Sequence, residues 1–335
     1  MRKLTMENVD MTDEAGTRHL IDPELLPGLE MLPAFQFSVE RLAAIRQGLS
    51  GSFPRTADAP IAPVEKVING PGGALDVFWY DPSPGTRDRP ALLHIHGGGM
   101  VVGSARQMQH GPSTLAASLG IPVASVEYRL APEIPFPGPQ EDCYAAVAWL
   151  AGAGLELGVD PGRIGVVGES AGGGLAAAVA QMARDRAGPA LAAQILVYPM
   201  LDYRVGGETD PWRNRYTGEF VWTRENNQFG WQSLRADYHP EDARKGWFSP
   251  SLADDLACLP PAWIGVGDLD LLFDEDLDYA RRLVAAGVPV ELHAYPGAFH
   301  GLNLLGGAQV AKDFNRNMLS GTARLLGLGT RADTA

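Results

Sequence analysis

The sequence predicts an α/β fold in which a mostly parallel sheet is covered by helices on both faces. Short apolar runs rich in β-branched residues recur along the chain, and each is followed by a helical pattern or by a turn rich in Gly and Pro. Hydrophobic residues make up 45% of the 335 residues and charged residues 20%, which is typical of globular proteins. We therefore expect a compact α/β protein.

Eight apolar runs are predicted to be strands. The first two flank the Gly- and Pro-rich turn at residues 69–73, so we expect them to pair as an antiparallel hairpin. The predicted strands are 64–68, 74–80, 91–95, 123–127, 164–168, 193–198, 262–267 and 288–295. The predicted helices are 113–119, 140–151, 172–186, 276–286 and 308–326.

Two stretches interrupt this alternation, residues 1–55 and an insertion at about 203–249. The insertion holds four of the seven tryptophans, together with several other aromatic residues. These side chains could simply form a satellite hydrophobic cluster that holds the insertion together. The alternative is a cap whose aromatic faces line an apolar pocket. Under that alternative, the candidate substrate-binding residues are Trp212, Phe220 and Trp222.

The charge and cysteine content exclude several classes of protein. The formal net charge is −13 and no cluster of Lys and Arg opposes it, so we expect no nucleic-acid partner. The N-terminus lacks the apolar run of a signal peptide and no stretch is apolar enough to span a bilayer, so we expect a cytoplasmic protein. The two cysteines, Cys143 and Cys258, are too few for a disulfide framework, and we expect both to be buried.

A first chemical motif lies at the end of a predicted strand. Residues 168–172 read Gly-Glu-Ser-Ala-Gly and match G-x-S-x-G, with an alanine-rich helical pattern after them. In this motif a tight strand-to-helix turn exposes the serine hydroxyl. Composition alone can produce such a match, but the strand before it and the helix after it favour Ser170 as a nucleophile.

A second motif is His96-Gly97-Gly98-Gly99, which directly follows the predicted strand 91–95. Consecutive glycines let backbone N–H groups converge on one point, where they stabilise the oxyanion of an acyl-transfer intermediate. We assign Gly98 and Gly99 as two donors and Ala171 as the third. The alternatives are a flexible glycine loop with a structural histidine, and a metal site at His94 and His96, for which no further ligand cluster is visible.

A serine nucleophile needs a base to accept its proton and a carboxylate to orient that base. His300 follows the last predicted strand and is the last histidine of the chain, so it is the predicted base. The acid has several candidates, of which Asp268 and Asp270 lie directly after the strand 262–267. The carboxylates at 274–278 suit the first turn of the next helix, so a capping role suffices for them. A calcium loop of the EF-hand type is disfavoured because its turn glycine is absent.

Together these motifs resemble the bacterial hormone-sensitive-lipase family of esterases, also called family IV, within the α/β-hydrolase superfamily. Further matches are Glu-Tyr-Arg-Leu-Ala-Pro-Glu at 127–133, Tyr-Pro-Met-Leu-Asp at 198–202, and Asp-Leu-Leu-Phe-Asp-Glu at 270–275, which is similar to the family's D-P-L-x-D-E. That last match selects Asp270 as the acid, with Leu271 at the position of the usual proline. The resemblance implies an α/β-hydrolase fold, residues 56–335, and a helical cap made by residues 1–55 and 203–249.

We therefore expect a serine carboxylesterase that uses Ser170, Asp270 and His300 and needs no metal or organic cofactor. The resemblance implies small-molecule esters with short to medium acyl chains as substrates, and a homodimer. A deacetylase, an amidase or a lactonase could use the same three residues. A non-catalytic small-molecule receptor is the alternative from another class, and the presence of all three residues disfavours it.

Overall fold

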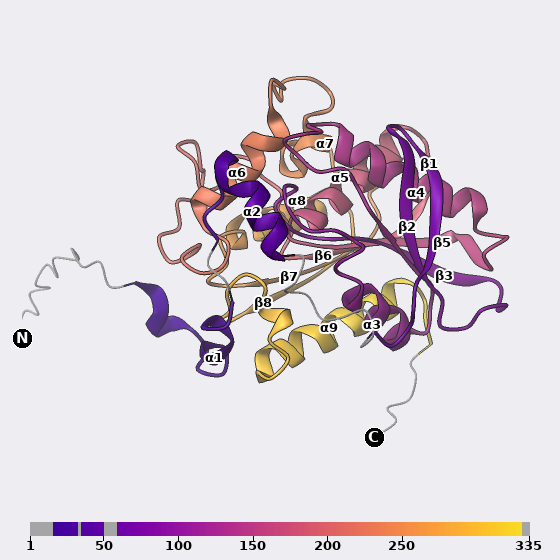
Figure 1. Cartoon of the computed structure of the whole chain (residues 1–335), viewed down its shortest axis with the longest axis horizontal. Coiled ribbons are helices and arrows are strands. Elements are labelled where there is room, and N and C mark those ends of the chain that lie inside the picture. The colour runs from indigo at the N-terminus through magenta and orange to yellow at the C-terminus, as the bar shows by residue number, and fades with distance from the viewer. Residues whose placement is uncertain (1–15, 33–34, 50–58, 330–335) are drawn as a thin grey trace, which may run out of the picture.

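The computed structural model describes residues 16–32, 35–49 and 59–329, and its core is an eight-stranded sheet (Figure 1). The strand order is β1-β2-β4-β3-β5-β6-β7-β8. β2 is antiparallel to both of its neighbours, β1 and β4, whereas all pairs from β4 to β8 are parallel. The strands are β1 (Val64–Gly70), β2 (Gly73–Tyr80), β3 (Arg89–Ile95), β4 (Val123–Val126), β5 (Val159–Glu169), β6 (Leu191–Val197), β7 (Ala262–Gly267) and β8 (Val290–Tyr295).

The α/β prediction and the hairpin are confirmed, and the element boundaries shift by a few residues. The α-helices are α1 (Leu26–Leu29), α2 (Val39–Leu49), α3 (His110–Leu119), α4 (Gly138–Ala153), α5 (Ala171–Asp185), α6 (Arg224–Arg235), α7 (Lys245–Phe248), α8 (Phe273–Ala285) and α9 (Gln309–Leu325). Short 3-10 turns are η1 (Thr17–Leu20), η3 (Pro250–Leu252) and η4 (Leu302–Leu304). Of the longer helices, α2 and α6 were not predicted, because both lie in stretches that break the strand-helix alternation.

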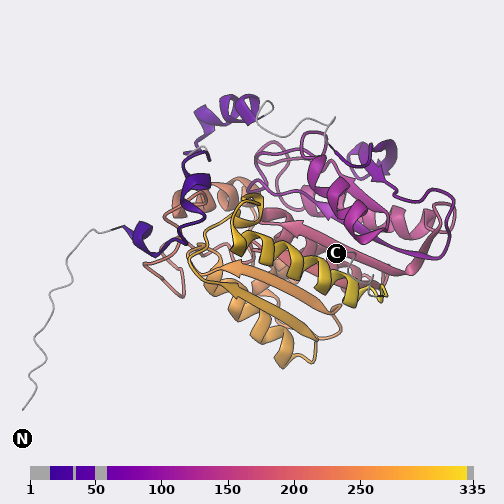
Figure 2. The ribbon, with the colours of Figure 1, turned by 90° about the horizontal axis from the view of Figure 1, so that it is seen from below.

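Helices cover both faces of the sheet, because a parallel strand pair needs a crossover connection that returns over one face. α3 and α9 contact each other and pack on one face, and α4 and α5 pack together on the other. α8 contacts α5, because the hydroxyl of Tyr279 in α8 accepts a hydrogen bond from the side chain of Gln181 in α5. In Figure 2 the yellow α9 crosses one side of the strands. Strands β3 and β7 are buried along their whole length, as expected for central strands of a sheet that is covered on both faces.

Part of the N-terminal stretch lies beside the 203–249 insertion. The side chain of Asn226, in α6, accepts a hydrogen bond from Phe37 N at 3.0 Å and donates one to Phe35 O at 2.8 Å. The ring of Phe37 stacks on that of Phe229, with centroids 6.0 Å apart. The expected cap segment 1–55 falls partly outside the described residues.

The expectation that both cysteines are buried was wrong for one of them. Cys143 is buried in α4, but Cys258 is exposed. Cys258 lies in a turn with φ +60° between Leu256 and Leu259, both of which are buried, so the turn itself faces outward. No helix in the described part of the chain is both long and apolar enough to cross a membrane.

Candidate active site

Ser170 lies between the end of β5 and the first residue of α5, with φ 57° and ψ −122°. This strained conformation persists because the surroundings fix it: Ser170 N donates to Val197 O at 2.9 Å. Gly172 permits a close approach behind the serine, since a side chain there would overlap the carbonyl oxygen of Ile95. The chain thus forms the tight turn that the G-x-S-x-G pattern predicts.

Ser170, His300 and Asp270 are connected by hydrogen bonds, although they come from three different loops. His300 Nε2 lies 2.9 Å from Ser170 Oγ, and His300 Nδ1 lies 2.7 Å from Asp270 Oδ2. The Asp270 carboxylate also accepts a hydrogen bond from Leu272 N at 3.0 Å, and Asp270 is 1% exposed. Because a carboxylate accepts hydrogen bonds, His300 carries its proton on Nδ1, and Nε2 is free to accept the Ser170 proton.

Asp268, the other candidate on this loop, does not contact the histidine. Its Oδ1 accepts a hydrogen bond from Gly297 N at 2.8 Å, and burial raises the pKa of its carboxyl. Asp268 therefore ties its own loop to the turn after β8. The geometry brings Asp270, and not Asp268, to His300.

The carboxylates after Asp270 do lie in the first turn of α8, but capping does not describe all of them. Asp274 accepts a hydrogen bond from the Asn214 side chain at 2.9 Å. Glu275 and Asp276 are fully buried, which the sequence interpretation missed. An acidic first turn is ordinarily solvated, and only the packing of α8 reveals that two of these groups face the interior.

The glycine loop after β3 lies against the serine turn. A methyl group on Gly97 would come 3.4 Å from Ser170 Cβ. Gly98 and Gly99 have φ values of +118° and +60°. Glycine adopts positive φ values readily because it has no Cβ. Among the described residues, none accepts a hydrogen bond from the N–H of Gly98 or Gly99. Ala171, the residue after Ser170, supplies the first N–H of α5, and it too has no protein acceptor among the described residues.

His94, in β3, and His96, at the start of the glycine loop, both have protein partners. His94 Nδ1 lies 2.9 Å from Ser125 Oγ, and its Nε2 lies 3.2 Å from the Glu169 carboxylate. His96 stacks on Tyr128 with ring centroids 4.2 Å apart and donates from Nδ1 to the next carbonyl oxygen. Burial lowers the pKa of His96 to about 4. His96 is therefore a neutral, packed imidazole that supports the loop, and no sequence pattern indicated its stacking partner.

Trp222 is the candidate pocket residue that reaches this site. Its ring centroid lies 5.9 Å from that of His300, and a side chain on Gly99 would overlap the indole. Its Nε1 donates to Asn227 Oδ1 at 2.9 Å, and Phe37 packs against its edge at 5.9 Å. Trp222 thus covers the space beside the serine and the glycine loop.

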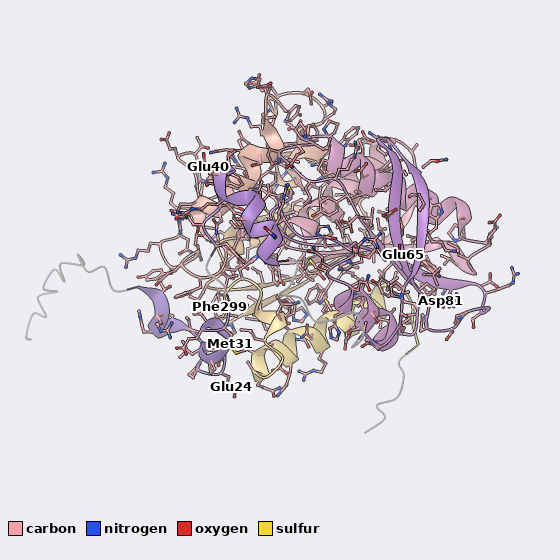
Figure 3. The ribbon with its side chains drawn as sticks, in the orientation of Figure 1. Glu24, Met31, Glu40, Glu65, Asp81 and Phe299 are labelled. Carbon is pink, nitrogen blue, oxygen red and sulfur yellow. The ribbon has the colours of Figure 1, made fainter. Side chains whose placement is uncertain are left out.

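The other two aromatic candidates make no ring contact with His300 among the described residues. Phe220 packs against Phe299, which is labelled in Figure 3 and precedes His300, with ring centroids 6.1 Å apart. Trp212 is partly buried against the main core. Within the described ranges, no ring contact joins Trp212 to His300. The aromatic content of the insertion was compatible with a satellite cluster or with a pocket wall, and it could not tell which ring lies against His300.

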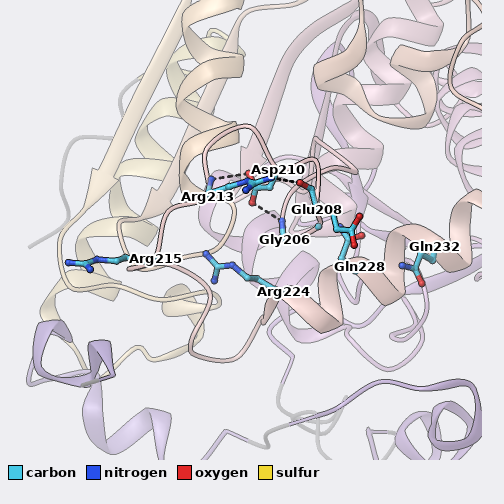
Figure 4. A pocket seen from close by; sticks show the side chains of 9 residues that line it. Gly206, Glu208, Asp210, Arg213, Arg215, Arg224, Gln228 and Gln232 are labelled. Carbon is cyan, nitrogen blue, oxygen red and sulfur yellow. Dashed lines mark hydrogen bonds between the residues drawn. The ribbon is translucent and has the colours of Figure 1, made fainter. Parts of the chain in front are cut away.

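An open groove lies on the 203–249 insertion itself (Figure 4). Ser170, Asp270 and His300 are not among its lining residues. The groove is lined by Gly206, Gly207, Glu208, Asp210, Arg213, Arg215, Arg224, Gln228 and Gln232.

Comparisons with known proteins agree with this fold. The family model described as alpha/beta hydrolase fold matches residues 92–304. Esterase LipI of Mycobacterium tuberculosis is 36% identical over 303 residues, which cover 88% of this chain and 91% of that protein. An ethyl acetate hydrolase of Pseudomonas putida is 36% identical over 241 residues, covering 70% and 73%. The solved structure of a bacterial heroin esterase superposes with a TM-score of 0.82 at 37% identity, covering 92% of this chain and 99% of that one.

Proposed function

The chain belongs to the alpha/beta hydrolase fold family as a hormone-sensitive-lipase-like serine carboxylesterase, and from this premise we propose that Ser170, His300 and Asp270 are its catalytic triad. Ester hydrolysis follows from the relatives, which are esterases and carboxylic ester hydrolases. The observation that carries the assignment of residues is the hydrogen-bond chain from Ser170 Oγ through His300 to Asp270, at 2.9 and 2.7 Å.

In the proposed first step, Ser170 Oγ attacks the ester carbonyl while His300 Nε2 accepts the hydroxyl proton. Asp270 holds the imidazole in the required tautomer and stabilises the imidazolium that forms. The tetrahedral intermediate collapses when His300 gives the proton to the leaving alcohol, and the acyl group stays on Ser170. Water then attacks the acyl carbonyl carbon while His300 takes its proton, and the second tetrahedral intermediate collapses to the carboxylic acid as His300 returns the proton to Ser170 Oγ.

Both tetrahedral intermediates carry an oxyanion that needs hydrogen-bond donors. We assign this role to the backbone N–H groups of Gly98, Gly99 and Ala171. Three observations support the assignment: the positive φ values of the two glycines, the lack of a protein acceptor for their N–H groups among the described residues, and the position of Ala171 at the start of α5 directly after Ser170. Loss of one such donor costs about 10²- to 10³-fold in kcat in other acyl-transfer enzymes.

We propose that residues 203–249, together with the N-terminal segment around Phe37, form a cap that restricts the site to short and medium acyl chains. Trp222 supports this size limit, because its indole lies against Gly99 and His300 at once. The names of two relatives, which act on ethyl acetate and on heroin, point to small esters as well. A homodimer is a further proposal from the family, and sedimentation velocity measures it directly.

The test of the triad is hydrolysis of p-nitrophenyl acetate by Ser170→Ala. We expect most activity to disappear while the unfolding temperature stays close to that of the wild type. Ser251→Ala is the matched control, because it also removes a buried serine hydroxyl, one that has no partner among the described residues. Full activity of Ser170→Ala would overturn the assignment of the nucleophile.

Two further measurements define the substrate. A rate series on p-nitrophenyl esters from acetate to dodecanoate reports the acyl limit, and we expect kcat/KM to fall beyond medium lengths. Matched amides and lactones distinguish the amidase and lactonase alternatives from simple ester hydrolysis. Covalent labelling of Ser170 by an alkyl phosphonate ester distinguishes an enzyme from a receptor that only binds.

A further inference from the structure

Glu275 makes a buried contact between two loops of the site. It lies in the first turn of α8 and is 0% exposed. Its Oε2 accepts a hydrogen bond from Asp202 N at 2.5 Å. The two residues come from different crossovers, since Asp202 follows β6 and Glu275 follows β7.

The loop on the Asp202 side holds the serine turn. Met200 N donates to Ser170 O at 3.0 Å, and Ser170 N donates to Val197 O at 2.9 Å. A side chain on Gly174, in the first turns of α5, would overlap the carbonyl oxygen of Met200, so helix and loop are packed in direct contact. A displacement of residues 198–202 would therefore move Ser170.

The loop on the Glu275 side holds the acid. Phe273 N, at the start of α8, donates to Asp270 O at 3.2 Å, and Leu272 N donates to the Asp270 side chain at 3.0 Å. Asp276 N donates to Leu272 O at 3.1 Å, which continues the helix through Glu275. Asp270 and Glu275 thus belong to one hydrogen-bonded unit.

The contact requires an acceptor and not a negative charge. Burial raises the pKa of Glu275 well above its usual range, and the nearby Asp202 carboxylate raises it further. Asp202 itself is held by both ends of the Arg204 guanidinium, at 2.9 and 2.6 Å. A neutral Glu275 still presents a carbonyl oxygen to Asp202 N. Glutamine has the same shape and the same acceptor.

We propose that Glu275 is a positioning residue for ester hydrolysis, which fixes the loop that carries Asp270 to the loop that holds Ser170. This proposal rests on the proposed catalytic triad. Glu275 has no contact with the reacting atoms and acts through the relative placement of Ser170, His300 and Asp270. Because misplacement of a reacting group by about 1 Å costs about 100-fold in rate, a small shift of either loop is sufficient to matter.

The test compares Glu275→Gln, Glu275→Asp and Glu275→Leu in the full chain. Glutamine keeps the acceptor and its reach, aspartate withdraws the acceptor by one methylene, and leucine removes it. We expect the kcat for p-nitrophenyl acetate to fall about 10- to 100-fold in the aspartate and leucine variants, with KM within about twofold of wild type. Glutamine should restore kcat to within about threefold.

Asp276→Asn is the matched control, because Asp276 is the next residue of α8, is equally buried, and has no partner for either carboxylate oxygen among the described residues. We expect its kcat to be close to wild type. Circular dichroism and thermal unfolding verify that each variant is folded. If Glu275→Leu does not fold, the kcat of Glu275→Asp alone tests the proposal.

The inference is overturned if folded Glu275→Asp keeps the wild-type kcat, or if Glu275→Gln loses as much as Glu275→Asp. The rate of Ser170 labelling by a phosphonate ester provides a second readout, and it should fall in parallel with kcat. The two proposals fail in different ways. An active Ser170→Ala refutes the triad itself, whereas an inactive Ser170→Ala with a fully active Glu275→Asp refutes only the positioning role.

Discussion

The indole of Trp222 lies against the imidazole of His300, with ring centroids 5.9 Å apart and planes inclined by 30°. The same indole blocks the space over Gly99 and is held by Asn227 through a 2.9 Å hydrogen bond. The 203–249 insertion therefore reaches the proposed base and the proposed oxyanion loop through one side chain. The packing of Trp222 therefore links the proposed acyl pocket to the proposed catalytic residues.

Replacement of Trp222 by alanine should change the acyl preference. Removal of the indole opens space beside Gly99 and His300, so kcat/KM for p-nitrophenyl octanoate should rise relative to that for the acetate. Trp222 is nearly buried, so we also expect a loss of about 3–5 kcal/mol in the free energy of unfolding. Steady-state kinetics on the ester series and urea denaturation measure the two effects.

Trp212→Ala is the control for this prediction. Trp212 belongs to the same insertion but packs against the main core. Its replacement should lower stability without changing the ratio of octanoate to acetate hydrolysis. Equal changes of that ratio in both variants would show that loosening of the insertion, and not the Trp222 indole, sets the preference.

Replacement of Asp270 by asparagine should reduce kcat by about 10³- to 10⁴-fold, because an amide donor facing His300 Nδ1 stabilises the wrong tautomer. Asp268→Asn should have little effect on kcat, since its carboxylate binds Gly297 N and not the histidine. Kinetics on p-nitrophenyl acetate compare the two variants. A larger loss in Asp268→Asn would contradict the assignment of the acid.

The same two aspartates show what sequence reasoning can and cannot resolve. Both follow β7 directly, and strand order alone places both near His300. The choice between them depends on how the loop turns after Gly267, which tertiary hydrogen bonds decide. The local sequence pattern did not distinguish Asp268 from Asp270 as the acid, and only the resemblance to a family motif selected Asp270.

The sheet was predictable because its central strands are short, mainly apolar runs that end at turn residues, as β7 illustrates. α6 (Arg224–Arg235) was not predicted because it lies in the insertion, outside the strand-helix alternation from which the other helices were predicted. Its start carried a local signal, since the Thr223 side chain accepts a hydrogen bond from Asn226 N. The burial of Glu275 and Asp276 had no local signal, because only the docking of α8 on the 198–202 loop encloses them.

The ion pair of Asp81 and Arg89 should contribute to stability far from the site. Figure 3 labels Asp81 at the opposite end of the molecule from Phe299. Arg89 Nη1 lies 2.6 Å from Asp81 Oδ1, and both side chains are mostly buried. Asp81→Asn leaves the Arg89 charge without its carboxylate, which should cost about 3 kcal/mol at pH 7. Activity at 25 °C should be unchanged.

This contribution should depend on pH in a defined direction. Burial alone would raise the pKa of Asp81, but the hydrogen bonds from Arg89 and Ser83 and the Arg89 charge lower it below 3.8. A carboxyl with a lowered folded-state pKa stabilises the protein above pH 3.8, and the contribution disappears as the pH falls through the folded-state pKa. The difference in unfolding free energy between wild type and Asp81→Asn should therefore shrink below pH 4. A constant difference across that range would contradict the ion-pair explanation.

Asp276 should have the opposite pH dependence. Burial, then the charges of Glu275 and Asp270, raise the pKa of the Asp276 carboxyl well above 3.8. A carboxyl with a raised folded-state pKa gives its full stabilisation below pH 3.8, and that stabilisation is lost as the pH rises toward the folded-state value, because the unfolded chain ionises first. Asp276→Asn does not titrate, so its stability relative to wild type should increase as the pH rises from the unfolded-state value toward the folded-state pKa of Asp276. Urea denaturation across this range measures the slope, which is independent of any constant packing difference between the two side chains. A slope of zero would mean that Asp276 is ionised and solvated in the folded protein.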